Sequence, residues 1–180
     1  MGAVDHDDPH GLATLIREVE DWPEQGVSFK DLTPLWADAR AFAVAIDRLA
    51  DRFVGRGIVK VVGMEARGFV VASPVAHRLG AGFVPVRKPN KLPWDTHSER
   101  YELEYGTDHL EIHRDAIAPG ERVLVVDDVL ATGGTAGATV QLVELLGGQV
   151  VGLGFIVELA FLGGATKLGP HEHHSLVTYR

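Results

Sequence analysis

Cysteine is absent from this chain of 180 residues, which excludes disulfide bonds and thiolate chemistry from its fold and from any activity. The sequence also lacks an apolar run of the roughly 20 residues that a helix needs to span a bilayer. Residues 1–8 are acidic and lack the apolar stretch of a secretory signal. Together these absences predict a cytoplasmic protein that is not inserted into a membrane.

An excess of basic residues is missing as well. Lysine and arginine number 17 against 25 aspartates and glutamates, which gives a formal net charge of −8. This charge disfavours general binding to nucleic acid, although a small phosphorylated ligand can still bind through local backbone N–H groups. The length and a hydrophobic content of 46% suit a single domain over residues 1–180, with a flexible extension at residues 1–8.

Hydrophobic periodicity predicts strands that alternate with helices. Apolar runs typical of strands occur at residues 58–62, 83–86, 110–113, 123–126, 150–157 and 175–179. Helical spacing is expected at residues 9–20, 38–53, 69–79 and 136–146. Residues 22–34 are expected to form an ordered loop, and residues 90–106 either a functional loop or a hairpin. This order predicts an α/β fold with a parallel sheet, in which ligands bind beyond the carboxyl ends of the strands.

The most informative segment covers residues 122–135. An apolar strand precedes two adjacent acids, Asp127 and Asp128, and a loop of small and hydroxyl residues then leads into a helix. Glycines in such a loop let the backbone approach a ligand closely, and successive N–H groups at a helix N-terminus attract an anion. The spacing is neither that of a Walker A loop nor that of a dinucleotide-binding turn. The segment therefore predicts a site for hydroxyls and a phosphate, with a solvated acidic turn as the alternative.

The segment resembles the signature of the type I phosphoribosyltransferases, and three further segments resemble the adenine phosphoribosyltransferases among them. Residues 29–34 are similar to that family's base-binding segment, and residues 63–69 to its pyrophosphate loop. Residues 87–93 and 101–106 are similar to its mobile catalytic loop. The resemblance implies a parallel twisted sheet flanked by helices, with a small hood and a mobile loop at residues 90–106.

The resemblance also implies a role for each matching residue. Asp127 and Asp128 are expected to hold the ribose hydroxyls, and Glu104 to handle the N9 proton of the purine. The 5-phosphate is expected to bind at Ala131, Thr132, Gly133, Gly134 and Thr135. The cations expected to bind pyrophosphate are Arg67, Arg87, Lys88 and Lys91. The adenine is expected to contact Ser28, Phe29, Arg67 and Leu159.

The implied reaction joins adenine to 5-phosphoribosyl 1-pyrophosphate and gives AMP and pyrophosphate, a purine-salvage transfer of a pentosyl group. Displacement of pyrophosphate from C1 of the ribose requires stabilisation of a charged leaving group, for which Mg²⁺ is the expected cofactor. No direct protein ligand is expected, because the substrate and water would hold the ion. The family implies a homodimer in which the Arg87 region lies near the partner's site.

Several alternatives remain at this stage. Another phosphoribosyltransferase would use xanthine, hypoxanthine or orotate, and a non-catalytic regulator would sense phosphoribosyl pyrophosphate without turnover. Arg87 and Lys88 taken alone suit a solvated strand end, and Phe29 and Leu159 suit a core. Residues 171–174, rich in histidine, are interpreted as an exposed tail in preference to a metal cluster. Asn90 and Trp94 stand where the family leads us to expect glycines.

Overall fold

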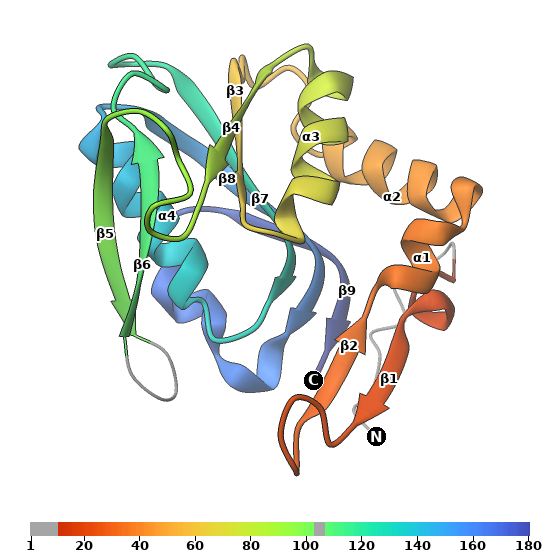
Figure 1. Cartoon of the computed structure of the whole chain (residues 1–180). Coiled ribbons are helices and arrows are strands. Elements are labelled where there is room, and N and C mark those ends of the chain that lie inside the picture. The colour runs from red at the N-terminus through yellow and green to blue at the C-terminus, as the bar shows by residue number, and fades with distance from the viewer. Residues whose placement is uncertain (1–10, 103–106) are drawn as a thin grey trace.

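The computed structural model describes residues 11–102 and 107–180, and a five-stranded parallel sheet lies at its centre (Figure 1). The strand order is β4-β3-β7-β8-β9. The strands are β3 (Lys60–Met64), β4 (Gly82–Val86), β7 (Arg122–Leu130), β8 (Gln149–Leu159) and β9 (His173–Tyr179). The predicted parallel α/β architecture is therefore confirmed.

Helices cover both faces of this sheet (Figure 1). The main ones are α2 (Ala39–Asp51) and α3 (Gly68–Leu79) on one face and α4 (Gly134–Leu145) on the other. Leu124 and Val126 of β7 belong to the core cluster under α2 and α3, whereas Val123 and Val125 belong to the cluster under α4. All four are fully buried. A strand covered on both faces needs apolar side chains at every position, which is why this run does not alternate.

Two antiparallel hairpins lie outside the central sheet. β1 (Arg17–Glu20) pairs with β2 (Ser28–Asp31), and β5 (Thr96–Glu102) pairs with β6 (Thr107–His113). The second hairpin lies against α4 and β4. The hairpin alternative for residues 90–106 is thus the correct one over its strands. Residues 103–106, which include Glu104, lie outside the described residues.

The predicted helix over residues 9–20 is wrong. In the described part of this range, residues 11–20, the structure has a 3₁₀ turn, η1 (Leu12–Leu15), followed by strand β1 at residues 17–20. Cross-strand pairing, with Val19 opposite Phe29, prevails over the helical spacing of the apolar residues. The same pairing makes β2 part of the expected loop at residues 22–34, and the short helix α1 (Thr33–Ala37) begins at its end.

Strand β7 continues to Leu130, four residues beyond the predicted end at residue 126. Asp127, Val129 and Leu130 still pair with β8. The two acids therefore belong to the strand rather than to the loop after it, and their backbone is held by the sheet. A ligand of the size of a ribose that binds at this edge of the sheet would contact carboxylates whose backbone is held in place by strand pairing.

Replacing Asp38 with alanine is expected to destabilise the protein by about 1 kcal/mol. Oδ1 of Asp38 caps α2 by accepting hydrogen bonds from the backbone N–H groups of Arg40 at 3.0 Å and Ala41 at 2.8 Å. Urea unfolding of the wild type and the variant measures the loss. Asp38→Asn is the matched control, since asparagine is an equally good cap and should retain the stability.

Candidate active site

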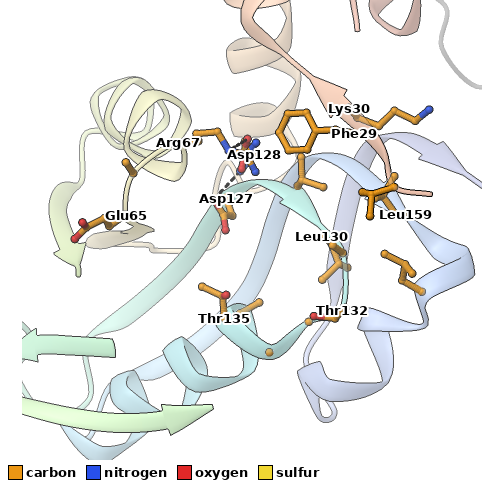
Figure 2. A pocket seen from close by; sticks show the side chains of 18 of the residues that line it. Phe29, Lys30, Glu65, Arg67, Asp127, Asp128, Leu130, Thr132, Thr135 and Leu159 are labelled. Carbon is orange, nitrogen blue, oxygen red and sulfur yellow. Dashed lines mark hydrogen bonds and ion pairs between the residues drawn. The ribbon is translucent and has the colours of Figure 1, made fainter. Parts of the chain in front are cut away.

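A cavity of about 370 Å³ opens at the carboxyl ends of β7 and β8 (Figure 2). Four parts of the chain surround it: β2, the loop after β3, the segment that joins β7 to α4, and the end of β8. Most of the predicted site residues line it, namely Ser28, Phe29, Arg67, Asp127, Asp128, Ala131, Thr132, Gly133, Gly134, Thr135 and Leu159. The structure thus brings together segments that are more than 100 residues apart in the sequence.

The loop at residues 131–135 has the geometry of an anion site. Gly133 has φ 76° and precedes the first turn of α4, so backbone N–H groups at the start of this helix have no partners within it. These N–H groups and the positive end of the helix dipole favour a phosphate. Figure 2 shows Thr132 and Thr135 beside the cavity, below the two aspartates.

The 3₁₀ segment η3 (Gly164–Leu168) packs directly against this loop, a contact that the sequence interpretation missed. A Cβ atom on Gly164 would lie 2.1 Å from the carbonyl oxygen of Ala131, and one on Gly133 would lie 2.2 Å from the carbonyl oxygen of Gly164. Both distances are far shorter than any van der Waals contact. The adjacent glycines at positions 163 and 164 were the only sequence signal of this close approach.

The two aspartates form an acidic pair in which Asp128 is buried and Asp127 is half-buried. Burial raises the pKa of Asp127 well above its ordinary value of 3.8, and the charge of Asp128 raises it further. Burial also raises the pKa of Asp128, while the Arg67 guanidinium opposes that shift. Nε of Arg67 lies 3.0 Å from Oδ2 of Asp128, yet this oxygen receives no well-angled hydrogen bond from residues 11–102 or 107–180. Hydroxyl donors of a ligand would complete its coordination.

Arg67 also borders an apolar part of the cavity. The guanidinium carbon of Arg67 is 5.0 Å from the centre of the Phe29 ring, and Trp22 packs edge-on against the same ring at 4.3 Å. Phe29 is only half-buried, so it is not a plain core residue. Leu159 lines the cavity with Leu162, which sequence reasoning had not selected. A flat aromatic ligand fits between such walls.

Lys30 is a further cavity residue that the sequence interpretation overlooked. It is buried, and its ammonium forms an ion pair with Glu18, the residue opposite it on β1. The same ammonium lies 4.8 Å from the centre of the Tyr179 ring. These contacts connect the β1–β2 hairpin to the last strand of the central sheet. The sequence signal for this ion pair is the opposite charge of two residues that face each other on paired strands. It could be recognised only once residues 17–20 were known to form a strand.

Three of the predicted pyrophosphate cations do not line the cavity of their own chain: Arg87, Lys88 and Lys91. Arg87 instead forms an ion pair with Glu65, with its Nε 2.9 Å from a carboxylate oxygen. Glu65 itself lines the cavity and was not among the predicted site residues. The interaction joins residues 22 positions apart and leaves no local pattern in the sequence.

Residues 171–174 are not an exposed tail, so that interpretation is wrong. His171 contacts Glu144 at 3.1 Å, and Glu172 pairs with Arg52 and Arg56 at 2.8 Å each. His173 begins β9 and lies 3.5 Å from Glu158. Within the described part of the chain, no group of three or more histidine, aspartate or glutamate side chains is arranged to hold a metal ion.

Comparison with known proteins agrees with this geometry. Residues 29–174 match the family model of the phosphoribosyl transferase domain. The adenine phosphoribosyltransferase of Alkaliphilus metalliredigens is 55% identical over 168 residues, which cover 93% of this chain and 99% of that protein. The crystal structure of the Thermoanaerobacter pseudethanolicus adenine phosphoribosyltransferase has a TM-score of 0.91 and 52% identity, covering 93% of this chain and 98% of the other.

A third match carries ligands. The Saccharomyces cerevisiae adenine phosphoribosyltransferase was crystallised with adenine and an imino-altritol bisphosphate. It has a TM-score of 0.87 and 38% identity, covering 92% of this chain and 96% of that chain. The parallel sheet, the paired acids and the glycine-rich anion loop, together with the match to the family model over residues 29–174, identify a phosphoribosyltransferase. Within that class, the chain belongs to the adenine phosphoribosyltransferase family.

In the part of the chain that the structure describes, no helix is long and apolar enough to cross a membrane.

Proposed function

We propose that this chain is a purine-salvage enzyme of the cytoplasm that transfers the 5-phosphoribosyl group of phosphoribosyl pyrophosphate to adenine. The observation that carries the proposal is that one cavity is lined by an acidic pair, an anion loop and apolar side chains. These three parts match the hydroxyls, the phosphate and the purine of AMP, the product. Pyrophosphate is released on the side of the loop that follows β3.

In the reaction, N9 of adenine forms a bond to C1 of the ribose while the bond from C1 to the pyrophosphate oxygen breaks. The electron pair of that bond leaves with pyrophosphate, and the N9 proton is removed. Asp127 and Asp128 bind the ribose hydroxyls and stabilise positive charge that develops on the sugar. Residues 131–135 bind the 5-phosphate through backbone N–H groups. Phe29 and Leu159 hold the purine plane, and backbone groups near Ser28 and Arg67 bind the edge of the base.

Glu104 is proposed to accept or relay the N9 proton, as the family implies. Glu104→Gln is then expected to lower kcat while leaving AMP binding largely intact, because the base acts only in the chemical step. Single-turnover kinetics together with AMP titration separate the two effects. An unchanged kcat would remove Glu104 from the mechanism.

Mg²⁺ is proposed as the cofactor. The residues present fit this ion, because it keeps several of its waters and binds phosphate oxygens of a substrate beside acidic side chains. Phosphate oxygens of the substrate and water would hold the ion, and the carboxylates of Asp127 and Asp128 in the cavity lining would face its water shell. When bound, the ion would neutralise charge on the departing pyrophosphate.

A homodimer is also proposed. Arg87 lies outside the cavity of its own chain, and the family places this region near the partner's site. Lys88 and Lys91 belong to the same turn. Sedimentation equilibrium is expected to give twice the chain mass of 19.4 kDa.

The experiment that tests the proposed function offers purified protein, phosphoribosyl pyrophosphate and Mg²⁺ separately with adenine, hypoxanthine, guanine, xanthine and orotate. AMP is expected from adenine, with much slower turnover of the other bases. Preferential turnover of another base would assign a different phosphoribosyltransferase activity. Binding of phosphoribosyl pyrophosphate without turnover of any base would identify a sensor and overturn the proposal.

A further inference from the structure

One carboxylate joins the end of β4 to the loop that follows β3. Oε2 of Glu65 accepts hydrogen bonds from Nε of Arg87 at 2.9 Å and from the backbone N–H of Lys88 at 3.1 Å. The side chain of Glu65 is only 15% exposed, and its backbone N–H donates to the carbonyl of Val86 at 2.9 Å. Three hydrogen bonds therefore fix Glu65 to consecutive residues of the neighbouring segment.

The same segment is held from its opposite side. Two backbone hydrogen bonds, of 3.0 and 2.7 Å, join Arg87 to Glu111 on β6. Oε2 of Glu111 also accepts from the backbone N–H of Asn90 at 3.1 Å, and Nη1 of Arg87 donates to the carbonyl of Lys91 at 3.1 Å. The turn at residues 87–91 thus has its shape set by acceptors on two other elements.

Glu65 lines the cavity in which phosphate groups are proposed to bind, where an unpaired carboxylate would repel the substrate. Its pairing with Arg87 compensates that charge, and the same oxygen also orients the Lys88 backbone. A partly buried carboxylate that accepts these two hydrogen bonds fixes the position of the Arg87 guanidinium and the course of the backbone at Lys88.

We propose that Glu65 is a positioning residue for pyrophosphate, which acts by orienting Arg87 and the Lys88 backbone rather than by touching the substrate. This inference rests on the proposed function and adds a residue to its pyrophosphate half. Orientation of Arg87 and of the Lys88 backbone requires an acceptor oxygen at the position of the Glu65 carboxylate. Shortening this side chain should therefore weaken pyrophosphate binding more than replacing it with a neutral side chain of the same length.

The test compares Glu65→Ala, Glu65→Asp and Glu65→Gln. The alanine and aspartate variants remove or withdraw the acceptor, and they are expected to raise the KM for phosphoribosyl pyrophosphate and the Kd for inorganic pyrophosphate about tenfold, as expected for one charge-assisted hydrogen bond. Glu65→Gln keeps an acceptor at the same reach and is expected to stay within about threefold of the wild type. The KM for adenine should not change in any variant.

A double-mutant cycle identifies the route of the effect. If Glu65 acts mainly through Arg87, adding Glu65→Ala to Arg87→Ala should change the KM for phosphoribosyl pyrophosphate by less than about twofold. Full additivity of the two substitutions would contradict the proposal. Asp47→Ala, which breaks an ion pair with Arg78 that does not line the cavity, is the matched control for loss of an ion pair.

The outcomes also separate this inference from the proposed function. If the wild type forms no AMP from adenine, the proposed function fails. If the wild type is active and both Glu65→Ala and Glu65→Asp keep the wild-type KM and the wild-type affinity for pyrophosphate, only the role of Glu65 is overturned. A parallel rise in the KM for adenine would likewise overturn it, because a general structural role predicts that result. Pyrophosphate affinity is measured by calorimetry, independently of turnover.

Discussion

The double substitution Asp127→Asn with Asp128→Asn is expected to lower kcat/KM for phosphoribosyl pyrophosphate about 10³-fold. Each carboxylate is proposed to accept a hydrogen bond from a ribose hydroxyl, and a hydrogen bond to a charged group contributes about 2 kcal/mol, so the pair contributes about 4 kcal/mol. Steady-state kinetics with phosphoribosyl pyrophosphate as the varied substrate measure the loss. Asparagine is nearly the same size as aspartate, so the cavity keeps its shape.

The same variant should be no less stable than the wild type. In the wild type the two carboxylates are adjacent, and desolvation together with repulsion by Asp128 raises the pKa of Asp127 well above 3.8. The folded protein therefore holds this proton more tightly than the unfolded chain. The resulting stability is complete below pH 3.8 and is lost as the pH rises through the pKa of the folded protein. Burial raises the pKa of Asp128 as well, which gives a contribution of the same sign.

Urea midpoints measured across this pH range are expected to fall with rising pH more steeply in the wild type than in the double variant. Turnover at the wild-type rate would remove the pair from ribose binding. A variant that loses both activity and stability would show that the aspartates are chiefly structural.

Gly164→Ala is expected to raise the KM for phosphoribosyl pyrophosphate at least about a hundredfold, since displacing a substrate-positioning group by about 1 Å can cost that much. The added Cβ would lie 2.1 Å from the carbonyl oxygen of Ala131 and 2.9 Å from the backbone nitrogen of Gly133. Both neighbours are backbone atoms, so no side-chain rotation relieves the clash. The phosphate loop must move, and its N–H groups then lose their common direction.

Gly163→Ala is the matched control for this substitution. Gly163 has φ 65° with no neighbour within 4 Å of the added Cβ, so alanine there costs about 1 kcal/mol of backbone strain without a clash. Its KM for phosphoribosyl pyrophosphate should stay near that of the wild type, while thermal unfolding reports the strain. Equal KM values in the two alanine variants would contradict the role assigned to the contact between Gly164 and Ala131.

The acidic pair and the phosphate loop could be predicted from the pattern of one continuous segment, whereas Ser28, Phe29, Arg67 and Leu159 were predicted only through the resemblance to the family. In that segment an apolar strand, two acids and a loop of small residues follow one another directly in the sequence. The parallel sheet places the ends of other strands beside them. The strand itself runs further than predicted, to Leu130, because pairing with β8 continues past the last fully apolar run.

The parts that sequence could not predict depend on contacts between distant residues. Lys30 lies opposite Glu18 and pairs with it only because residues 17–20 form a strand. The apolar spacing of these residues predicted a helix instead. The role proposed for Glu65 depends on its ion pair with Arg87, and the role of Gly164 depends on its close approach to Ala131. None of these three pairs lies within one helix turn or one strand, so no periodicity connects its members.

The most direct test of the account is a crystal structure of the protein with AMP bound. The account predicts that the 5-phosphate contacts backbone N–H groups of residues 132–135, that the ribose hydroxyls donate to Asp127 and Asp128, and that the adenine lies against Phe29. AMP bound with its phosphate at the Arg67 side, or outside this cavity, would contradict it.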